Sequence, residues 1–253
     1  MFKLTVIRAV YILCLALCNN LVNADTTLVA VAANFSKPMT EIADSFEKAT
    51  GHSAKLSFGS SGKFVAQIEN GAPFEVFLSA DESGPAKVEQ DGLAVSGSRN
   101  TYAIGKLVLW SSTPGYVDSE GKILATGGFK HVSVADPKLA PYGAAAIDYL
   151  KKQGLLEKLQ PLMVFGENIT QTQLFVSSGN AELGFVALSQ VYEDGHINSG
   201  SGYIIPTSQY APIKQGAVLL TKGNDNPAAK ALIDYLKSDT ARSIISKYGY
   251  DLP

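Results

Sequence analysis

Four turns in the sequence combine small residues with hydroxyl or amide side chains, and each stands where a strand-like run gives way to a helical pattern. They are residues 32–36 (AANFS), 58–62 (FGSSG), 136–143 (DPKLAPYG) and 165–169 (FGENI). The first amides of a helix have no intrahelical acceptor, so the N-terminus of a helix attracts anions. Ser and Asn are also common helix caps, and capping explains each turn taken alone. Four such turns at matching ends of one fold favour a shared anion site.

The elements that must position these turns follow from the hydrophobic pattern. Strand-like apolar runs occur at residues 27–32, 54–58, 76–78, 107–110, 132–135, 162–165, 183–186 and 217–220. Helical patterns lie between them, as at Met39, Ile42 and Phe46, whose spacing predicts a helix that Gly51 ends. This alternation predicts an α/β fold of mainly parallel sheets flanked by helices. In such folds ligands bind beyond the carboxyl ends of the strands, where helices begin.

Two polar, turn-rich segments predict a division into two lobes. These segments are residues 96–103 (SGSRNTYA) and 199–214 (SGSGYIIPTSQYAPIK), and we expect the chain to cross between lobes there. Lobe 1 would comprise residues 25–104 together with 213–253, and lobe 2 would comprise residues 105–212.

The N-terminus has the features of a secretion signal. Lys3 and Arg8 precede an apolar run, residues 9–17, that is too short to span a bilayer, and an A-x-A-like site predicts cleavage after Ala24. Removal of residues 1–24 would take away Cys14 and Cys18, the two cysteines of the chain, so we expect no disulfide or thiolate site in the mature protein. The net charge of −2 becomes more negative without the signal, which argues against nucleic acid as a partner.

Other chemistries find weaker support in the sequence. The three histidines, at positions 52, 131 and 196, show no metal-ligand spacing. Ser60 and Lys63 match the S-x-x-K motif of penicillin-recognising serine enzymes, but the companion S-D-N and K-T-G elements are absent. A serine hydrolase using Ser60 and Lys63 remains a remote alternative. Glu167 is read as a charge in the first turn of a helix.

The chain resembles the periplasmic molybdate-binding proteins of ABC transporters over essentially the whole of the predicted mature length. The matching strings are VAANF (31–35), SFGSSG (57–62), IENGAPFEVFLSAD (68–81), ADP (135–137), APYG (140–143), LGFV (183–186) and KYGY (247–250). The string at 68–81 is the most specific of them.

The resemblance implies a fold, a site and partners. The fold would be the two-lobed periplasmic binding protein type II, and the protein a monomer that needs no cofactor, is not an enzyme, and passes its anion to a membrane permease. The family's anion-contacting positions correspond to Asn34 with its neighbour Ala33, to Ser61, to Tyr142 and to the backbone N–H of Ile169. Molybdenum would be present only within the bound oxyanion, with no direct protein ligand.

One position departs from some family members. Those members carry a ligating tyrosine after the Leu-Gly-x-Val strand, where this chain has Ala187. We therefore expect the hydroxyl of Tyr142 to take that place.

The bonding pattern of the anion agrees with this reading. Molybdate at neutral pH is fully deprotonated and only accepts hydrogen bonds, which suits a site of N–H and hydroxyl donors. Hydrogen phosphate carries a proton that would find no acceptor there. Sulfate bonds as molybdate does, so a receptor for another oxyanion such as sulfate is the alternative, and tungstate should bind together with molybdate.

Overall fold

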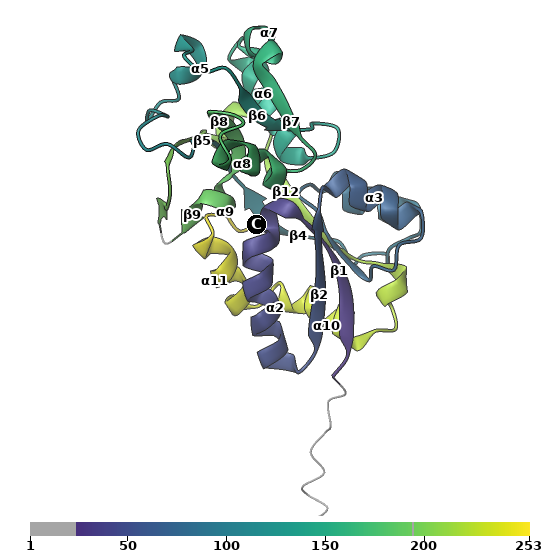
Figure 1. The fold of residues 1–253 in the computed structure, drawn as a ribbon. Helices are drawn as coiled ribbons and strands as arrows, with labels where there is room; N and C mark the ends of the chain where they lie inside the picture. The colour runs from purple at the N-terminus through teal and green to yellow at the C-terminus, as the bar shows by residue number, and fades with distance from the viewer. Residues whose placement is uncertain (1–23, 194) are drawn as a thin grey trace, which may run out of the picture.

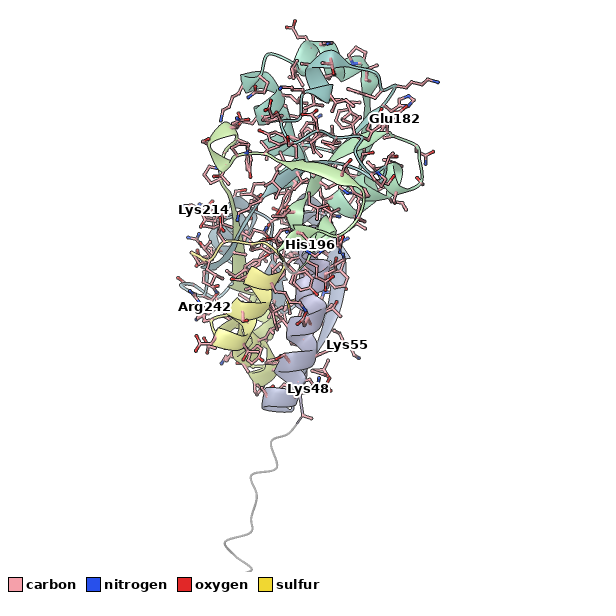
Figure 2. The ribbon with its side chains drawn as sticks, turned by 90° about the vertical axis from the view of Figure 1, so that its left-hand side faces the viewer. Lys48, Lys55, Glu182, His196, Lys214 and Arg242 are labelled. Atoms are coloured by element: carbon pink, nitrogen blue, oxygen red, sulfur yellow. The ribbon has the colours of Figure 1, made fainter. Side chains whose placement is uncertain are left out.

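The structure is a computed structural model that describes residues 24–193 and 195–253. The predicted signal, including its two cysteines, therefore falls almost entirely outside the described residues. Within the described part of the chain, the strands form two five-stranded sheets and a two-stranded hairpin. Figure 1 shows the sheets in separate halves of an elongated molecule, and Figure 2 shows, from the side, Glu182 near one end and Lys48 near the other.

The first sheet has the order β2-β1-β3-β12-β4. Its strands are β1 (Thr26–Ala32), β2 (Ser53–Gly59), β3 (Val76–Leu78), β4 (Asn100–Gly105) and β12 (Ile213–Leu219). Strand β1 alternates, with Val29 and Val31 facing one apolar cluster and Ala30 the other. Helices α2 (Ser36–Thr50), α10 (Pro227–Tyr235) and α11 (Asp239–Lys247) cover the first face, and helices α3 (Ser61–Glu69) and α4 (Ser83–Gln90) cover the second.

The second sheet has the order β11-β5-β8-β6-β7. Its strands are β5 (Leu107–Ser111), β6 (Val132–Ala135), β7 (Met163–Gly166), β8 (Leu183–Ala187) and β11 (Ser201–Ile204). Helix α6 (Pro141–Lys152) packs on one face and α8 (Ile169–Ser177) on the other. The smaller elements are α5 (Ile123–Thr126), α7 (Leu156–Leu159), α9 (Leu188–Val191) and the hairpin of β9 (Tyr192–Glu193) and β10 (His196–Ile197), together with the 3-10 turns η1 (Ala33–Phe35), η2 (Gln160–Leu162), η3 (Thr207–Gln209) and η4 (Thr221–Gly223).

The α/β prediction is confirmed, and α2 buries Met39, Ile42 and Phe46 and ends at Gly51 with a φ of 76°. The sheets are more mixed than mainly parallel. Strands β1, β2 and β3 run parallel, as do β6, β7 and β8, but β12 and β5 each pair antiparallel with both neighbours. The antiparallel pairings involve the strands next to the crossings between the sheets, which are β4 and β12 in the first sheet and β5 and β11 in the second.

The predicted crossings are shorter than the polar composition indicated. Residues Asn100–Gly105 form β4, because Tyr102 and Ala103 are buried in the first core and the strand pairs with β12. The second segment contains β11 and the start of β12. The strands of the first sheet lie within residues 26–105 and 213–219, and those of the second sheet lie within residues 107–204. The lobe boundaries at 25–104 plus 213–253 and at 105–212 stay a prediction.

Candidate functional site

Residues from all four turns line one small cavity between the two halves of the molecule. The lining residues are Ala32, Ala33, Asn34, Gly59, Ser60, Ser61, Ala80, Ala140, Pro141, Tyr142, Asn168 and Ile169. Its free volume is about 10 Å³, close to that of one water-sized sphere. The structure thus brings the five sequence-predicted residues (Ala33, Asn34, Ser61, Tyr142 and Ile169) to one place, although their role in binding stays a prediction.

In the first turn of helix α6, only the amide of Tyr142 lacks an acceptor within the helix. Pro141, its first residue, has no N–H, and the amides of Gly143 and Ala144 both donate to the carbonyl of Ala140 (2.9 and 3.2 Å). The N–H of Tyr142 has no acceptor within the helix at this position. This amide is therefore a candidate donor to a ligand in the cavity that Tyr142 lines.

Helix α8 presents Ile169 in the same way. The side-chain oxygen of Asn168 accepts the amides of Thr170 and Gln171 (3.0 Å each), and the main-chain carbonyl of Asn168 accepts the amide of Thr172 (3.1 Å). Capping thus consumes the other early amides of α8 and leaves the N–H of Ile169 for a ligand. Asn168 is the N-cap residue of α8, as expected for a turn of this composition. The backbone N–H of Ile169 is the early amide of α8 that this cap does not bind.

Helix α3 contributes Ser61, whose hydroxyl oxygen accepts the amide of Ala80 (2.9 Å). Because that lone pair is occupied by a donor, the hydroxyl proton of Ser61 is available to an acceptor in the cavity. The next amide, that of Gly62, donates to the carbonyl of Leu139 (3.0 Å), which lies in the other half of the molecule. Helix α3 therefore contacts the other half of the molecule through Gly62, the residue that follows Ser61.

The side chain of Asn34 turns toward a buried polar network rather than standing free. Its amide donates to Gln215 Oε1 and to the hydroxyl of Tyr250 (2.9 Å each). The main-chain carbonyl of Asn34 accepts the hydroxyls of Ser189 (2.8 Å) and Tyr250 (2.9 Å). The backbone N–H of Asn34 lies at the start of the turn η1, where amides lack an acceptor within the helix, and its role toward a ligand stays a prediction.

The hydroxyl of Tyr142 contacts the first half of the molecule, and the expectation that it replaces a missing ligand tyrosine stays a prediction. Gln215 Nε2 donates to it at 3.1 Å, and a Cβ added to Gly105 would lie 2.1 Å from the same oxygen. The hydroxyl lies against strands β4 and β12 because Gly105 leaves space there. Tyr142 thus lines the cavity and links α6 to the first half of the molecule through its hydroxyl, and which of its groups would contact a ligand stays a prediction.

Sequence reasoning did not single out Gln215 or Ser189, and it placed Tyr250 only within a family string. With Asn34, Tyr102 and Tyr142 they form a buried network that joins the two halves of the molecule behind the cavity. These partners lie far apart in the chain, so no local pattern signals them.

Neutral groups line the cavity. Among its lining residues, all within the described ranges, none is Asp, Glu, Lys, Arg or His. An anion there would be held by dipoles at the starts of α3, α6 and α8 and by hydrogen bonds. Lys63 and Glu167 flank the site and pair with each other (2.7 Å), each about half exposed, so their charges largely cancel at its edge.

The tyrosine hydroxyls of the network stay protonated at neutral pH. Burial raises the pKa of Tyr250 to about 12, an increase that its hydrogen bonds to Ser189 and Asn34 oppose. Burial also raises the pKa of Tyr102 and of Tyr142 well above 10. The network is therefore fully protonated throughout the physiological range.

We expect stability to fall in alkaline solution as a result. In the unfolded chain the tyrosines ionise near pH 10, whereas in the folded protein Tyr250 keeps its proton until about pH 12. Below pH 9 the free energy of unfolding should be unaffected by these groups. Between pH 10 and 12 it should decrease, by about 2–3 kcal/mol from Tyr250 alone. Urea unfolding at pH 8, 10 and 11.5 measures this, and a constant free energy across that range would contradict it.

The serine-enzyme alternative needs Lys63 beside Ser60. Lys63 Nζ instead pairs with Glu167, and the Ser60 hydroxyl has no hydrogen-bond partner among the described residues. The structure does not assemble that pair.

Two further findings concern the described residues alone. No group of three or more His, Cys, Asp or Glu side chains among them is placed to hold a metal ion. None of their helices has the length and apolar character required to cross a bilayer.

Comparison with known proteins gives a consistent result. Residues 27–251 match the family model described as bacterial extracellular solute-binding protein. The chain is 59% identical to the molybdate-binding protein ModA of Azotobacter vinelandii (88% of this chain, 89% of the relative) and 52% identical to that of Rhodobacter capsulatus (90% and 88%). It is also similar to the solved structure of the periplasmic molybdate-binding protein of Azotobacter vinelandii, with a TM-score of 0.87 and 43% identity over 90% of this chain and 99% of that one. The chain belongs to the bacterial extracellular solute-binding proteins, in the family that includes these molybdate-binding proteins.

Proposed function

We propose that this protein captures molybdate, and equally tungstate, in the cavity between its halves and delivers it to the permease of an ABC transporter. The observation that supports the proposal is the lining of the cavity: it consists only of neutral residues and includes Tyr142, Ile169 and Ser61, whose two amides and hydroxyl we infer to be the available donors. The names of the relatives, which are molybdate-binding proteins, supply the identity of the anion.

The donor set also distinguishes between oxyanions. A fully deprotonated dianion accepts every hydrogen bond that such a site offers. The proton of hydrogen phosphate would be left without an acceptor among neutral donors, at a cost of about 1–3 kcal/mol. Sulfate matches in bonding, and we infer that the size of the closed cavity selects against it.

The remaining parts of the proposal follow from this role. The protein works in the periplasm as a monomer, after removal of residues 1–24. It performs no reaction and needs no cofactor, because the molybdate is its cargo. Nucleic acid is not a partner.

Titration of the purified protein by calorimetry with molybdate, tungstate, sulfate and phosphate tests the proposal. We expect tight binding of molybdate and tungstate and weak or absent binding of the other two. Tight binding of sulfate without binding of molybdate would overturn the assignment in favour of a sulfate receptor.

Replacement of Ser61 with Ala should weaken molybdate binding by about 1.5–3 kcal/mol, because it removes a charge-assisted hydrogen bond. That is about a 10- to 150-fold rise in Kd. Ser45→Ala is a matched control, since Ser45 also bonds through its hydroxyl, to Tyr235 (2.7 Å), but lies in α2 outside the cavity lining. Unchanged affinity in Ser61→Ala would show that this serine only holds Ala80.

A further inference from the structure

Ser60, next to the predicted ligand Ser61, carries a buried hydroxyl with no hydrogen-bond partner among the described residues. The residue is 3% exposed and lines the cavity. Buried hydroxyls in native proteins are almost always hydrogen-bonded, because an unpaired one costs free energy. An orphan hydroxyl at a cavity therefore requires an explanation.

Its position would ordinarily make Ser60 a helix cap. Ser60 is the N-cap residue of α3, with an extended backbone (φ −79°, ψ 143°), yet its side chain accepts no capping hydrogen bond. In contrast, the N-cap side chains of Asn168, Asn226 and Ser238 all accept amides of their own helices.

The cause lies in the contact between the two halves of the molecule. The amide of Gly62, the second residue of α3, donates to the carbonyl of Leu139. A Cβ on Gly62 would lie 3.2 Å from the Leu139 Cα, so only a small residue permits this approach. The contact between the halves thus uses one of the two amides that a capping serine can accept, and the side chain of Ser60 accepts neither.

We propose that Ser60 is an additional anion-contacting residue, whose hydroxyl donates a hydrogen bond to an oxygen of the bound oxyanion. Ser60 and Ser61 would then act as adjacent hydroxyl donors at the start of α3. The inference rests on the proposed function, since it assigns one more contact in the same cavity. It also explains the orphan hydroxyl, because a tetrahedral oxyanion supplies an acceptor that the chain lacks.

Two other buried hydroxyls without partners, those of Thr27 and Ser133, provide the comparison. Both are fully buried, in β1 and β6, and neither lines the cavity. Ser133→Ala is therefore a control that removes an orphan hydroxyl elsewhere in the core.

The test is calorimetric titration of Ser60→Ala, Ser60→Cys and Ser133→Ala with molybdate, with urea unfolding of each ligand-free protein. We expect at least a tenfold rise in Kd for Ser60→Ala, a smaller rise for Ser60→Cys, which keeps a weaker donor, and wild-type affinity for Ser133→Ala. The ligand-free stability of Ser60→Ala should not decrease, because no hydrogen bond within the protein is lost.

Two outcomes separate the inference from the function on which it rests. A Kd within twofold of wild type in both Ser60 variants would overturn the role of Ser60 while leaving molybdate capture intact. Failure of the wild-type protein to bind molybdate would overturn the proposed function, and the contact inferred here with it.

Discussion

Gly143→Ala should destabilise the protein by about 3 kcal/mol and weaken molybdate binding with it, even though alanine is the better helix former. A Cβ at this position would lie 2.1 Å from the carbonyl oxygen of Ala135 and 2.7 Å from its carbon. These are backbone atoms at the end of β6, so no side chain can rotate to relieve the contact. Overpacking of this kind costs about 1–3 kcal/mol or more.

Helix propensity alone predicts the opposite sign, because Gly→Ala within a helix gains about 1 kcal/mol. Binding should suffer because α6 must shift at its first turn, which carries the amide of Tyr142. Urea unfolding and calorimetry measure the two effects. The exposed neighbour offers a control: Ala144→Gly should lose only about 1 kcal/mol and keep its affinity. A Gly143→Ala protein as stable as the wild type would show that β6 and α6 separate at little cost.

Gln215→Met should cost about 2–4 kcal/mol of unfolding free energy, because it removes the centre of the network behind the cavity. The fully buried amide of Gln215 accepts from Asn34 Nδ2 and from the hydroxyl of Tyr102 (2.9 Å each) and donates to the hydroxyl of Tyr142 (3.1 Å). Methionine has a similar volume and no comparable donor or acceptor, so these groups lose a partner at about 1–3 kcal/mol for each one left unpaired. Asn34 keeps Tyr250 and Tyr102 keeps the carbonyl of Ser79, which sets the upper limit.

The same change should raise the Kd for molybdate, because Asn34 and Tyr142 both line the cavity. Gln160→Met, at an exposed position, serves as the control and should alter the unfolding free energy by less than about 0.5 kcal/mol. A loss below 1 kcal/mol in Gln215→Met would mean that the network contributes little to holding the halves together.

The extent to which sequence predicts this molecule depends on the range of the interactions concerned. The periodicity of α2 and the composition of the four turns are local, so both the helix and the convergence of the turns follow from short stretches of residues. Strand β4 was missed because its polar composition is typical of a loop. It is held by pairing with β12, more than 100 residues later, and by burial of Tyr102.

The orientation of site side chains is decided at longer range still. Asn34 meets Gln215 and Tyr250 at sequence separations of 181 and 216 residues. No spacing rule connects such partners, so the sequence places Asn34 and Tyr142 at the site without showing which of their groups face it. The orphan hydroxyl of Ser60 likewise depends on the Gly62–Leu139 contact across the halves.

The place of β12 in the first sheet has a consequence for how the protein is made. This strand, residues 213–219, lies between β3 and β4, and within the described residues it supplies the ladder connecting them. A ribosome delivers the chain from its N-terminus, so the first sheet lacks its fourth strand until most of the chain has been synthesised. The strands of the second sheet all lie between residues 107 and 204 and can pair earlier. The first half of the molecule to be synthesised is therefore the last to be completed. Until translation is nearly finished, the nascent chain lacks a complete first sheet and can still be exported in an unfolded state.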